Sequence, residues 1–578
     1  MKRRTFVAGV AGTAGLALSA AACSNSTTSS GASSSAAAGA VKGGTLNILM
    51  STQTEHWDPQ RVYVGVNIEA GNRLFTRTLT TWTPTTSDTD VPKLVGDMAT
   101  DTGTVSNGGK TWKFTLKDGL KWQDGSPVTA DDVKYGISRT FAVDVITGGP
   151  NYAIAFLDIP SDSDGSSSYK GPYAKTGQDL YDKAVTVSGN TITFNLKQPV
   201  NDFNNTVTMT AFAAFKQSKD LGDKSNFDIF SDGPYQLDGT WTAQKGGNFV
   251  RNPNWDPSTD TVRKAYPDKI TWDESLTAET MYERLIADQG SDQFAITFDQ
   301  APVTALSNIQ TGAAGRNSIV PSPYTRYLTP NFKSKVMSKD QARQALALAT
   351  DRSAYVTAVG GPIVAQPTNS VINPALPAFP NTPLPAGDKG DPAKAKQLLQ
   401  DAGFTLPVKI TVAYRKSDTM DKVFAGLKAG WDAGGFDTQL DGFSANYYAT
   451  IQSPASALKY DAMWAGWGAD YPSASTDIPP LFDSRINITS GGSGQDYGWF
   501  DNADFNKEID ATTLIADQAA REKAWGKLDT ELTTKYYAVI PLIVDKFVFV
   551  HGSKVVGAFV NGAYTGYYDP ATISVKAS

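Results

Sequence analysis

Cysteine and histidine are almost missing from this chain of 578 residues, which contains one Cys and two His. A single cysteine, Cys23, excludes an intramolecular disulfide, and His56 and His551 are too few to complete a Cys/His zinc site. A Ser/His/Asp or Cys/His catalytic site would have to use one of these histidines, and no G-x-S-x-G segment surrounds a serine. We therefore predict a protein that is not an enzyme and that holds no metal and no cofactor. Glycoside hydrolysis stays open at this point, since any two carboxylates could meet in space.

Clusters of positive charge and long hydrophobic runs are also missing. The net charge is −6 and no block of five or six like charges occurs, which argues against a nucleic-acid partner. No run of about 18 apolar residues follows the N-terminal region, so no further membrane span is predicted. Hydrophobic residues make up 40% and charged residues 19%, which is typical of a globular chain. At about 150 residues per domain, the length allows roughly three or four domains or lobes.

The N-terminus has the pattern of an export signal. Lys2, Arg3 and Arg4 form a charged segment, and the stretch 6–22 is apolar but rich in Gly and Ala. The pair Arg3-Arg4 resembles a twin-arginine signal, although export by the general route stays open. We predict a signal peptide at residues 1–22.

Cys23 follows this apolar stretch, and its position resembles the cleavage and lipidation site of a bacterial lipoprotein. Ala20 stands where such sites usually carry Leu, so an ordinary signal peptide with an incidental cysteine is the alternative. The segment 23–42 would then be the lipidated Cys and a flexible Ser/Ala/Gly/Thr tether. This predicts an extracytoplasmic protein held at the outer face of the bacterial cell membrane by a lipid on Cys23.

Hydrophobic periodicity predicts strands alternating with helices. Alternating and β-branched runs predict strands at 43–50, 111–119, 191–196, 409–414 and 539–550. Apolar residues at helical spacing predict helices that begin after Thr129 and at 338–352, 391–404 and 519–537. We expect Ser338 with Gln341 to form a capping box, and Asp391 to cap the helix that begins with Pro392. The class is α/β, split into lobes.

Several motifs, in a fixed order, resemble the extracellular solute-binding proteins of family 5, the oligopeptide-, dipeptide- and nickel-type receptors of ABC importers. The resemblance spans about residues 43 to 555. Its motifs are TWKFTLKDGLKWQDGSPVTADDVKYGISR (111–139), SDGPYQL (231–237), VRNPNWDP (250–257), YLTPNFKSKVMSKDQARQALALATDR (327–352), DPAKAKQLLQDAGF (391–404) and YDAMWAGWGADYP (460–472).

The resemblance implies a two-lobed periplasmic-binding-protein-like fold of the class II, or cluster C, type. A hinged ligand cleft would lie between the lobes, with an extra subdomain in the first lobe. It also implies delivery of the ligand to ABC permease subunits in the membrane, by a protein that we expect to be a monomer. The expected pieces are lobe I at 43–85, 225–322 and 536–578, the extra subdomain at 86–224, and lobe II at 323–535.

Asp470 is the leading candidate for ligand contact. In peptide-binding members of the family, the Asp of the Ala-Asp-Tyr segment pairs with the α-ammonium of the peptide, and Asp470 stands at that position. A buried carboxylate is costly unless a cation meets it. Trp467 and Tyr471 would offer flat walls, and Gly468 would leave room for the ligand's backbone. The alternative from the residues alone is that Asp470 caps the turn that follows it.

Four further residues are weaker candidates for the cleft. Tyr63 and Asn67 follow the first strand, and Tyr447 precedes the Asp470 segment. Arg326 could face a ligand carboxylate, with a surface salt bridge as its alternative use.

The resemblance implies an oligopeptide or dipeptide as the ligand, and an oligosaccharide is the alternative. Some family members stack sugars on Trp, whereas an amine-binding Asp favours a peptide. Nickel and haem ligands are disfavoured because only two histidines are present. A receptor that signals by ligand occupancy without import stays open.

Overall fold

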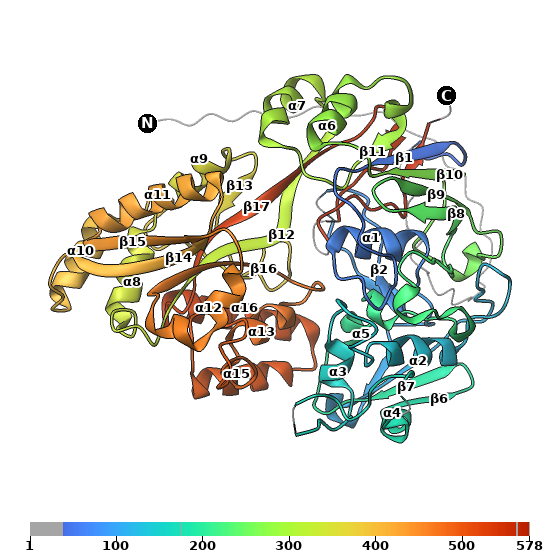
Figure 1. Ribbon diagram of the computed structural model, residues 1–578, viewed down its shortest axis with the longest axis horizontal. Coiled ribbons are helices and arrows are strands. Elements are labelled where there is room, and N and C mark those ends of the chain that lie inside the picture. Colours follow the sequence, from blue (N-terminus) through green and yellow to red (C-terminus); the bar gives the residue numbers. More distant parts are fainter. Residues whose placement is uncertain (1–38, 89, 164, 175, 562–564, 577–578) are drawn as a thin grey trace, which may run out of the picture. The chain divides into compact units, whose positions relative to one another are not determined.

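The computed structural model describes residues 39–578, except residues 89, 164, 175, 562–564, 577 and 578. The predicted signal peptide and Cys23 lie outside the described residues. Strands and helices alternate along the described chain and build separate sheets (Figure 1), which confirms the α/β class. Among the described residues, no helix is both long and apolar enough to cross a membrane.

Lobe I, as we use the term, surrounds a five-stranded mixed sheet. Its strand order is β11 (Ala295–Ile296), β1 (Thr45–Leu49), β10 (Lys269–Asp273), β9 (Gly246–Arg251) and β8 (Tyr235–Thr242). β1 runs parallel to both of its neighbours, and Ile48 pairs with Trp272 on one side and Ile296 on the other. All three side chains are buried in one core, which confirms the strand predicted at 43–50. The other elements of this lobe are α1 (Gly65–Leu74), β2 (Thr80–Trp82), α6 (Ala278–Ala287), α7 (Leu306–Gly312), β18 (Val555–Val556) and β19 (Ser574–Val575). β2 pairs with β3 (Leu94–Gly96), which lies in the range expected for the subdomain.

The subdomain has its own four-stranded antiparallel sheet. The strand order is β4 (Thr104–Ser106), β5 (Thr111–Thr115), β7 (Thr191–Asn195) and β6 (Val185–Ser188). Trp112 pairs with Phe194 and Phe114 with Ile192, and these four buried side chains realise the predicted period-two pattern. The helix predicted to begin after Thr129 is confirmed, and Thr129 and Asp132 form a capping box at the start of α2. The helices are α2 (Ala130–Arg139), α3 (Tyr152–Phe156), α4 (Gln178–Ala184) and α5 (Phe203–Thr206).

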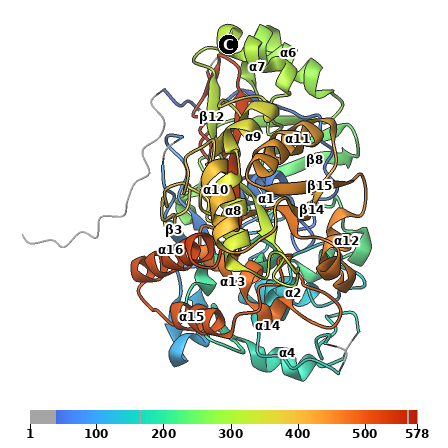
Figure 2. The same cartoon turned by 90° about the vertical axis from the view of Figure 1, so that its left-hand side faces the viewer.

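Lobe II surrounds a six-stranded sheet. Its order is β13 (Ala365–Pro367), β17 (Ile540–Val550), β12 (Asn317–Pro330), β16 (Ala462–Gly468), β14 (Val408–Arg415) and β15 (Phe436–Phe443). Its helices are α8 (Asp340–Ala349), α9 (Arg352–Val359), α10 (Pro392–Asp401), α11 (Asp418–Ala433), α12 (Tyr447–Gln452), α13 (Ile478–Phe482), α14 (Ser484–Asn487), α15 (Ala503–Thr513) and α16 (Gln518–Thr534). α8 packs against α10 and α9 packs against α11 (Figures 1 and 2).

Two capping predictions in lobe II have different outcomes. Asp391 caps α10 through the Lys394 amide, as predicted. The single helix predicted at 338–352 is wrong: α8 begins at Asp340 without a side-chain cap, and a second helix, α9, begins after Asp351. The carboxylate of Asp351 accepts a hydrogen bond from the Ala354 amide, so this residue starts a helix instead of ending one.

Two long strands connect the lobes. Near residues 317–321, β12 pairs with the end of β17 that packs beside β1, where Val548 and Leu49 share one core. From Thr325 onward, β12 pairs with β16 inside lobe II. The register between β12 and β17 shifts between Pro321 and Thr325. This irregularity interrupts the ladder where the chain passes from one lobe to the other.

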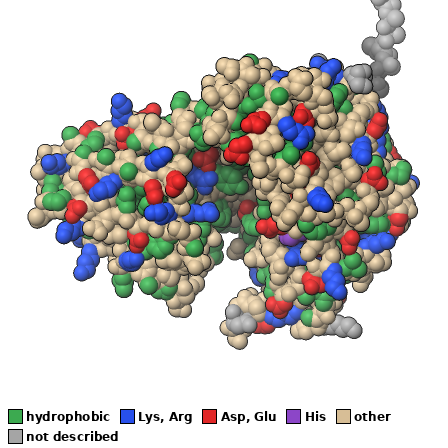
Figure 3. Space-filling view, turned by 45° about the horizontal axis from the view of Figure 1, so that its top comes forward, with side chains coloured by type: hydrophobic (Ala, Val, Ile, Leu, Met, Phe, Trp, Pro, Cys, Tyr) green, Lys and Arg blue, Asp and Glu red, His purple; other side chains and the backbone are tan. Residues whose placement is uncertain are grey.

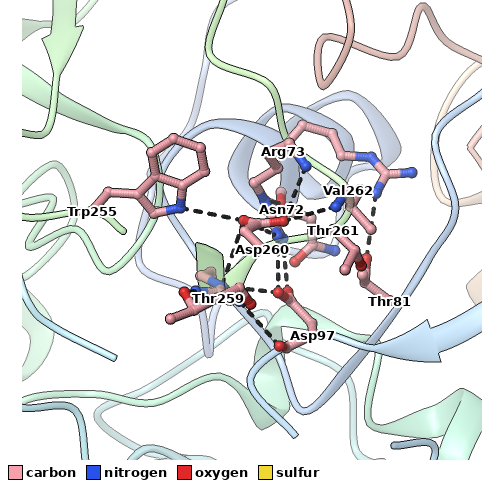
Figure 4. Close-up of polar contacts among 12 residues, drawn as sticks. Asn72, Arg73, Thr81, Asp97, Trp255, Thr259, Asp260, Thr261 and Val262 are labelled. Carbon is pink, nitrogen blue, oxygen red and sulfur yellow. Dashed lines mark hydrogen bonds and ion pairs between the residues drawn. The ribbon is translucent and has the colours of Figure 1, made fainter. Parts of the chain in front are cut away.

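A buried ionic network fixes the base of the subdomain to lobe I (Figure 4). Asp97 accepts from Arg77 Nε at 2.8 Å and from Arg263 Nη2 at 2.8 Å, and Arg263 also pairs with Asp260 at 3.1 Å. All four side chains are almost fully buried. Burial alone would raise the pKa of Asp97, but the two guanidinium groups hold it below its ordinary value. These buried ion pairs therefore hold the subdomain in place against lobe I.

Candidate functional site

The end of β16 carries the chain to the candidate site. Gly468 pairs with Tyr324 on β12. A Cβ atom at Gly468 would lie 2.9 Å from the carbonyl oxygen of Pro323, so glycine allows the two strands to approach closely. The direction in which a side chain would point at Gly468 is filled by β12 and is not left open for a ligand's backbone.

Two tyrosines from lobe I and the subdomain donate hydrogen bonds to the carboxylate of Asp470. Tyr63, from the segment before α1, donates its hydroxyl to Oδ1 at 2.9 Å. Tyr152, on α3 of the subdomain, donates its hydroxyl to Oδ2. The backbone amide of Asp470 donates to Thr476 Oγ1 at 3.2 Å, which fixes the turn that carries the carboxylate. The side chain of Asp470, in lobe II, is therefore hydrogen-bonded to both lobe I and the subdomain.

Burial governs the protonation of this cluster. It raises the pKa of Asp470, although the hydrogen bonds from Tyr152 and Tyr63 oppose the rise. Burial, with the charge of Asp470, also raises the pKa of both tyrosines, so both hydroxyls stay protonated and donate. Each carboxylate oxygen has two acceptor positions, and each receives one tyrosine hydroxyl. Acceptor capacity for a further donor therefore remains on Asp470.

The two aromatic neighbours of Asp470 have different surroundings. Trp467 is partly buried, and its Nε1 donates to the carbonyl of Thr476 at 2.7 Å. Tyr471 is almost fully buried in the core of the subdomain, and its hydroxyl accepts from Thr206 Oγ1 at 3.1 Å. Tyr471 is thus a side chain of lobe II that is anchored in the subdomain.

A second polar contact between the subdomain and lobe II lies beside the first. The hydroxyl of Ser473 is 3.0 Å from Asp202 of the subdomain and 3.1 Å from Glu522 on α16. Ser475 also donates to Asp202, at 2.5 Å. Burial raises the pKa of Glu522 to about 7, and the charge of Asp202 adds to the rise. The contact therefore involves a carboxyl group that titrates near neutral pH.

These contacts border a cavity of about 1020 Å³ between the subdomain and lobe II. The space-filling view shows one face of the molecule hollowed between its two parts (Figure 3). Four of the predicted residues line the cavity: Tyr63, Trp467, Asp470 and Tyr471. Most of the remaining walls come from residues 149–156, from residues 198–202 and from α13, α14 and α15. A cavity of this size, with aromatic and aliphatic walls and a smaller set of charged and polar side chains, is typical of a ligand site.

Three predicted residues are not brought to this cavity. Asn67 is buried on α1, and its side-chain amide donates to Thr54 Oγ1 at 3.3 Å. Tyr447 is buried in the core of lobe II, and its hydroxyl lies 2.6 Å from the carbonyl oxygen of Trp464. Arg326 pairs with Asp545 on the neighbouring strand at 2.6 Å, and both side chains are partly buried. Their contact with a ligand stays a prediction.

Sequence reasoning missed Tyr152 and Asp202, the partners of the Asp470 segment. Tyr152 lies 318 residues before Asp470, and no motif connects them. The only signal was compositional, since an aromatic helix follows the GGPN turn at 148–151. Among the described residues, no group of three or more His, Cys, Asp or Glu side chains is arranged to hold a metal ion.

The family model of the bacterial extracellular solute-binding proteins, family 5, matches residues 93–488. The chain belongs to this family. Its members are the substrate-binding components of ABC transporters, so the prediction of a binding protein instead of an enzyme is confirmed. The two-lobed fold and the extracytoplasmic placement expected of family 5 are confirmed as well.

Relatives and solved structures agree with this membership. The glutathione-binding protein GsiB of Escherichia coli (strain K12) is 26% identical over 477 residues, which covers 79% of this chain and 82% of GsiB. The structure of clavulanic acid biosynthesis oligopeptide binding protein 2 superposes with a TM-score of 0.83 at 26% identity, covering 94% of this chain and 99% of that protein. The unliganded open form of the periplasmic murein tripeptide binding protein MppA has a TM-score of 0.71 at 21% identity, covering 93% and 98%, and shows the same fold.

Proposed function

We propose that this protein is the peptide receptor of an ABC importer, and that the cavity at Asp470 holds the peptide. The observation that carries the proposal is the carboxylate of Asp470, which lies at the cavity wall. Burial raises its pKa. Its hydrogen bonds in the described chain include no cationic partner. A peptide's α-ammonium would supply the missing positive charge. Relatives named for glutathione and oligopeptide binding support a peptide ligand.

The tyrosines would complete the site instead of competing with the ligand. Tyr63 and Tyr152 each donate one hydrogen bond to Asp470, and an ammonium would take the remaining acceptor positions. Because these donors come from lobe I and the subdomain, they would engage Asp470 only when the lobes are close together. Ligand capture and lobe closure would therefore stabilise each other.

The division into lobes at residues 322/323 and 535/536 is part of the proposal. The first boundary coincides with the register shift between β12 and β17, and the second lies between α16 and β17. We expect opening of the cavity to bend these strands at the irregularity, as hinges do in other two-lobed proteins. The protein would work as a monomer at the outer face of the cell membrane, held by a lipid on Cys23, and would deliver its ligand to the permease.

An oligosaccharide is the second candidate, because rings line the cavity. Trp467, Tyr63 and Tyr152 all contribute to its walls, and aromatic faces are also used to bind sugars. A sugar, however, would leave the charge of Asp470 without a cation.

Thermal stabilisation of the purified protein by short peptides tests the proposal. Each peptide is measured with a free and with an acetylated N-terminus, on the natural protein and on Asp470→Asn. A ligand at 100 times its Kd adds about 2.7 kcal/mol of stability. We expect free peptides to stabilise the natural protein, and acetylation and Asp470→Asn each to weaken binding by about 10- to 100-fold, as for one charge-assisted hydrogen bond of about 1.5–3 kcal/mol.

The matched control is Asp504→Asn, which removes an exposed carboxylate of α15 that does not line the cavity. It should leave peptide binding unchanged. Equal binding of free and acetylated peptides would contradict the role of Asp470, and stabilisation by oligosaccharides alone would favour the second candidate.

A further inference from the structure

We infer that the cavity selects cationic peptides with an apolar side chain and disfavours anionic ones. The inference deepens the proposed function and rests on it. It concerns the charge of the whole cavity, beyond the single contact between Asp470 and an ammonium group.

The described residues that line the cavity carry a formal charge of −3. Four of them are aspartates, namely Asp202, Asp470, Asp483 and Asp510, and the one cationic side chain among them is Arg485. These charges face a shared space with apolar walls, where water screens them less than at an open surface. The field inside the cavity therefore favours a positively charged ligand.

Arg485 is not available to bind a ligand's carboxylate. Its Nε and Nη2 donate to the two oxygens of Asp483 at 2.9 and 2.7 Å. Its Nη1 and Nη2 donate to the two oxygens of Asp510 at 2.7 and 2.7 Å. Four of the five N–H donors of the guanidinium are thus used in two bidentate pairs. An incoming carboxylate would have to displace one of these aspartates.

Two cations that lie close to lining residues along the chain are also engaged. Lys197 precedes the lining residue Gln198, but its ammonium donates to the carbonyl of Ile154 at 3.0 Å. Lys507, on the same helix as Asp510, pairs with Asp504 at 2.8 Å. A peptide's C-terminal carboxylate therefore meets no unpaired cation among the described residues of the cavity wall.

The remaining wall is apolar. Phe156 and Val200 of the subdomain face the cavity together with Ile486, Ile509 and Leu514 of lobe II. These side chains would bury an aliphatic or aromatic group of the ligand. Glutathione, with two carboxylates and one ammonium at neutral pH, fits neither the charge nor the apolar wall, so we expect the specificity to differ from that named for GsiB.

Isothermal titration of the purified protein with one peptide series tests this inference. The series is Ala-Leu-X-Leu-Ala with X as Lys, Gln or Glu, a free N-terminus, and the C-terminus either as carboxylate or as amide. We expect the Lys peptide to bind at least about tenfold more tightly than the Glu peptide, with Gln between them. Amidation should strengthen binding or leave it unchanged. The Lys/Glu ratio should shrink between about 0.01 and 1 M salt, where the screening length falls from about 30 to 3 Å.

Two variants at half-exposed positions should change this ratio in opposite directions. Arg485→Gln removes the cation and should raise the Lys/Glu ratio, whereas Asp510→Asn removes an anion and should lower it. Both side chains are about half exposed, so neither change should prevent folding. Glu283→Gln, at an exposed position of α6 outside the cavity lining, is the control that should leave the ratio unchanged.

Three outcomes would overturn the inference. If peptides bind but the Glu peptide equals or exceeds the Lys peptide, the charge argument is wrong while the proposed function stands. If amidation of the C-terminus abolishes binding, a cation must receive the carboxylate, so the charge argument is again wrong while the proposed function stands. If no peptide of either charge binds, the proposed function is refuted, and this inference falls with it.

Discussion

Replacing Glu522 with Gln should make the protein more stable at high pH and leave its stability unchanged at low pH. Glu522 is almost fully buried on α16, next to the contact between Ser473 and Asp202. The hydroxyl of Ser473 has one proton to donate, so it cannot satisfy both carboxylates at once. A glutamine keeps the size of the side chain and one acceptor oxygen, but needs no proton to stay neutral.

The size of the effect follows from the pKa of Glu522. Burial first, and then the charge of Asp202, raise this pKa from 4.5 to about 7. Between pH 4.5 and 7 the folded protein keeps the proton and the unfolded chain has lost it, so the free energy of unfolding falls as the pH rises. At 1.36 kcal/mol per pH unit, the loss is at most about 3 kcal/mol and is complete above pH 7. The Gln variant should not show this loss.

Urea unfolding of both proteins at pH 4.5, 6, 7 and 8 measures the difference directly. The buried carboxyl of Asp529, with a pKa of about 7, affects both proteins alike and cancels in the difference. We expect the advantage of the Gln variant to grow from near zero at pH 4.5 to its full value at pH 8. Glu283→Gln, at an exposed position of α6, is the control. A difference that does not change with pH would refute the reasoning, since only a proton bound at Glu522 can produce the slope.

Two further predictions concern the frame that holds the site. Asp97→Asn should lower the free energy of unfolding by about 3–5 kcal/mol, because it leaves two buried arginines without their shared carboxylate. Urea unfolding measures this loss, with Asp101→Asn at an exposed position as the control. A loss of less than about 1 kcal/mol would contradict the prediction. Gly468→Ala should cost about 1–3 kcal/mol, because the new Cβ would lie 2.9 Å from the backbone oxygen of Pro323. Gly491→Ala meets nothing closer than 3.6 Å, so thermal unfolding should show a clear loss for the first variant and little for the second.

Much of the local structure could be predicted from the sequence. Trp112 and Phe114 alternate with polar residues in a strand that buries one face, and that pattern depends only on the two-residue period of a strand. Asp391 and Pro392 start a helix because a side-chain oxygen and a fixed φ suit its first turn. The helix predicted across 338–352 failed because Asp351 resembles a last-turn residue in the sequence, while in the structure it caps the next helix.

The candidate site could be predicted only in part. The resemblance to family 5 singled out Asp470 and its aromatic neighbours, and these residues line the cavity. It also singled out Tyr447, whose ring is packed in the core of lobe II. Aromatic side chains serve cores and ligand sites alike, so their residue type cannot separate the two uses.

The sequence by itself determined the class of this protein: its periodicities require alternating strands and helices, and its ordered motifs identify the family. Only the tertiary structure decided what surrounds Asp470. Tyr63 and Tyr152 are 407 and 318 residues away along the chain, yet both donate to its carboxylate. The pairing of Arg485 with Asp483 and Asp510, which occupies the one cation of the described lining, is equally a product of folding. Short-range patterns fix elements because they act through neighbouring residues, whereas charge and burial in a cavity depend on which distant segments meet there.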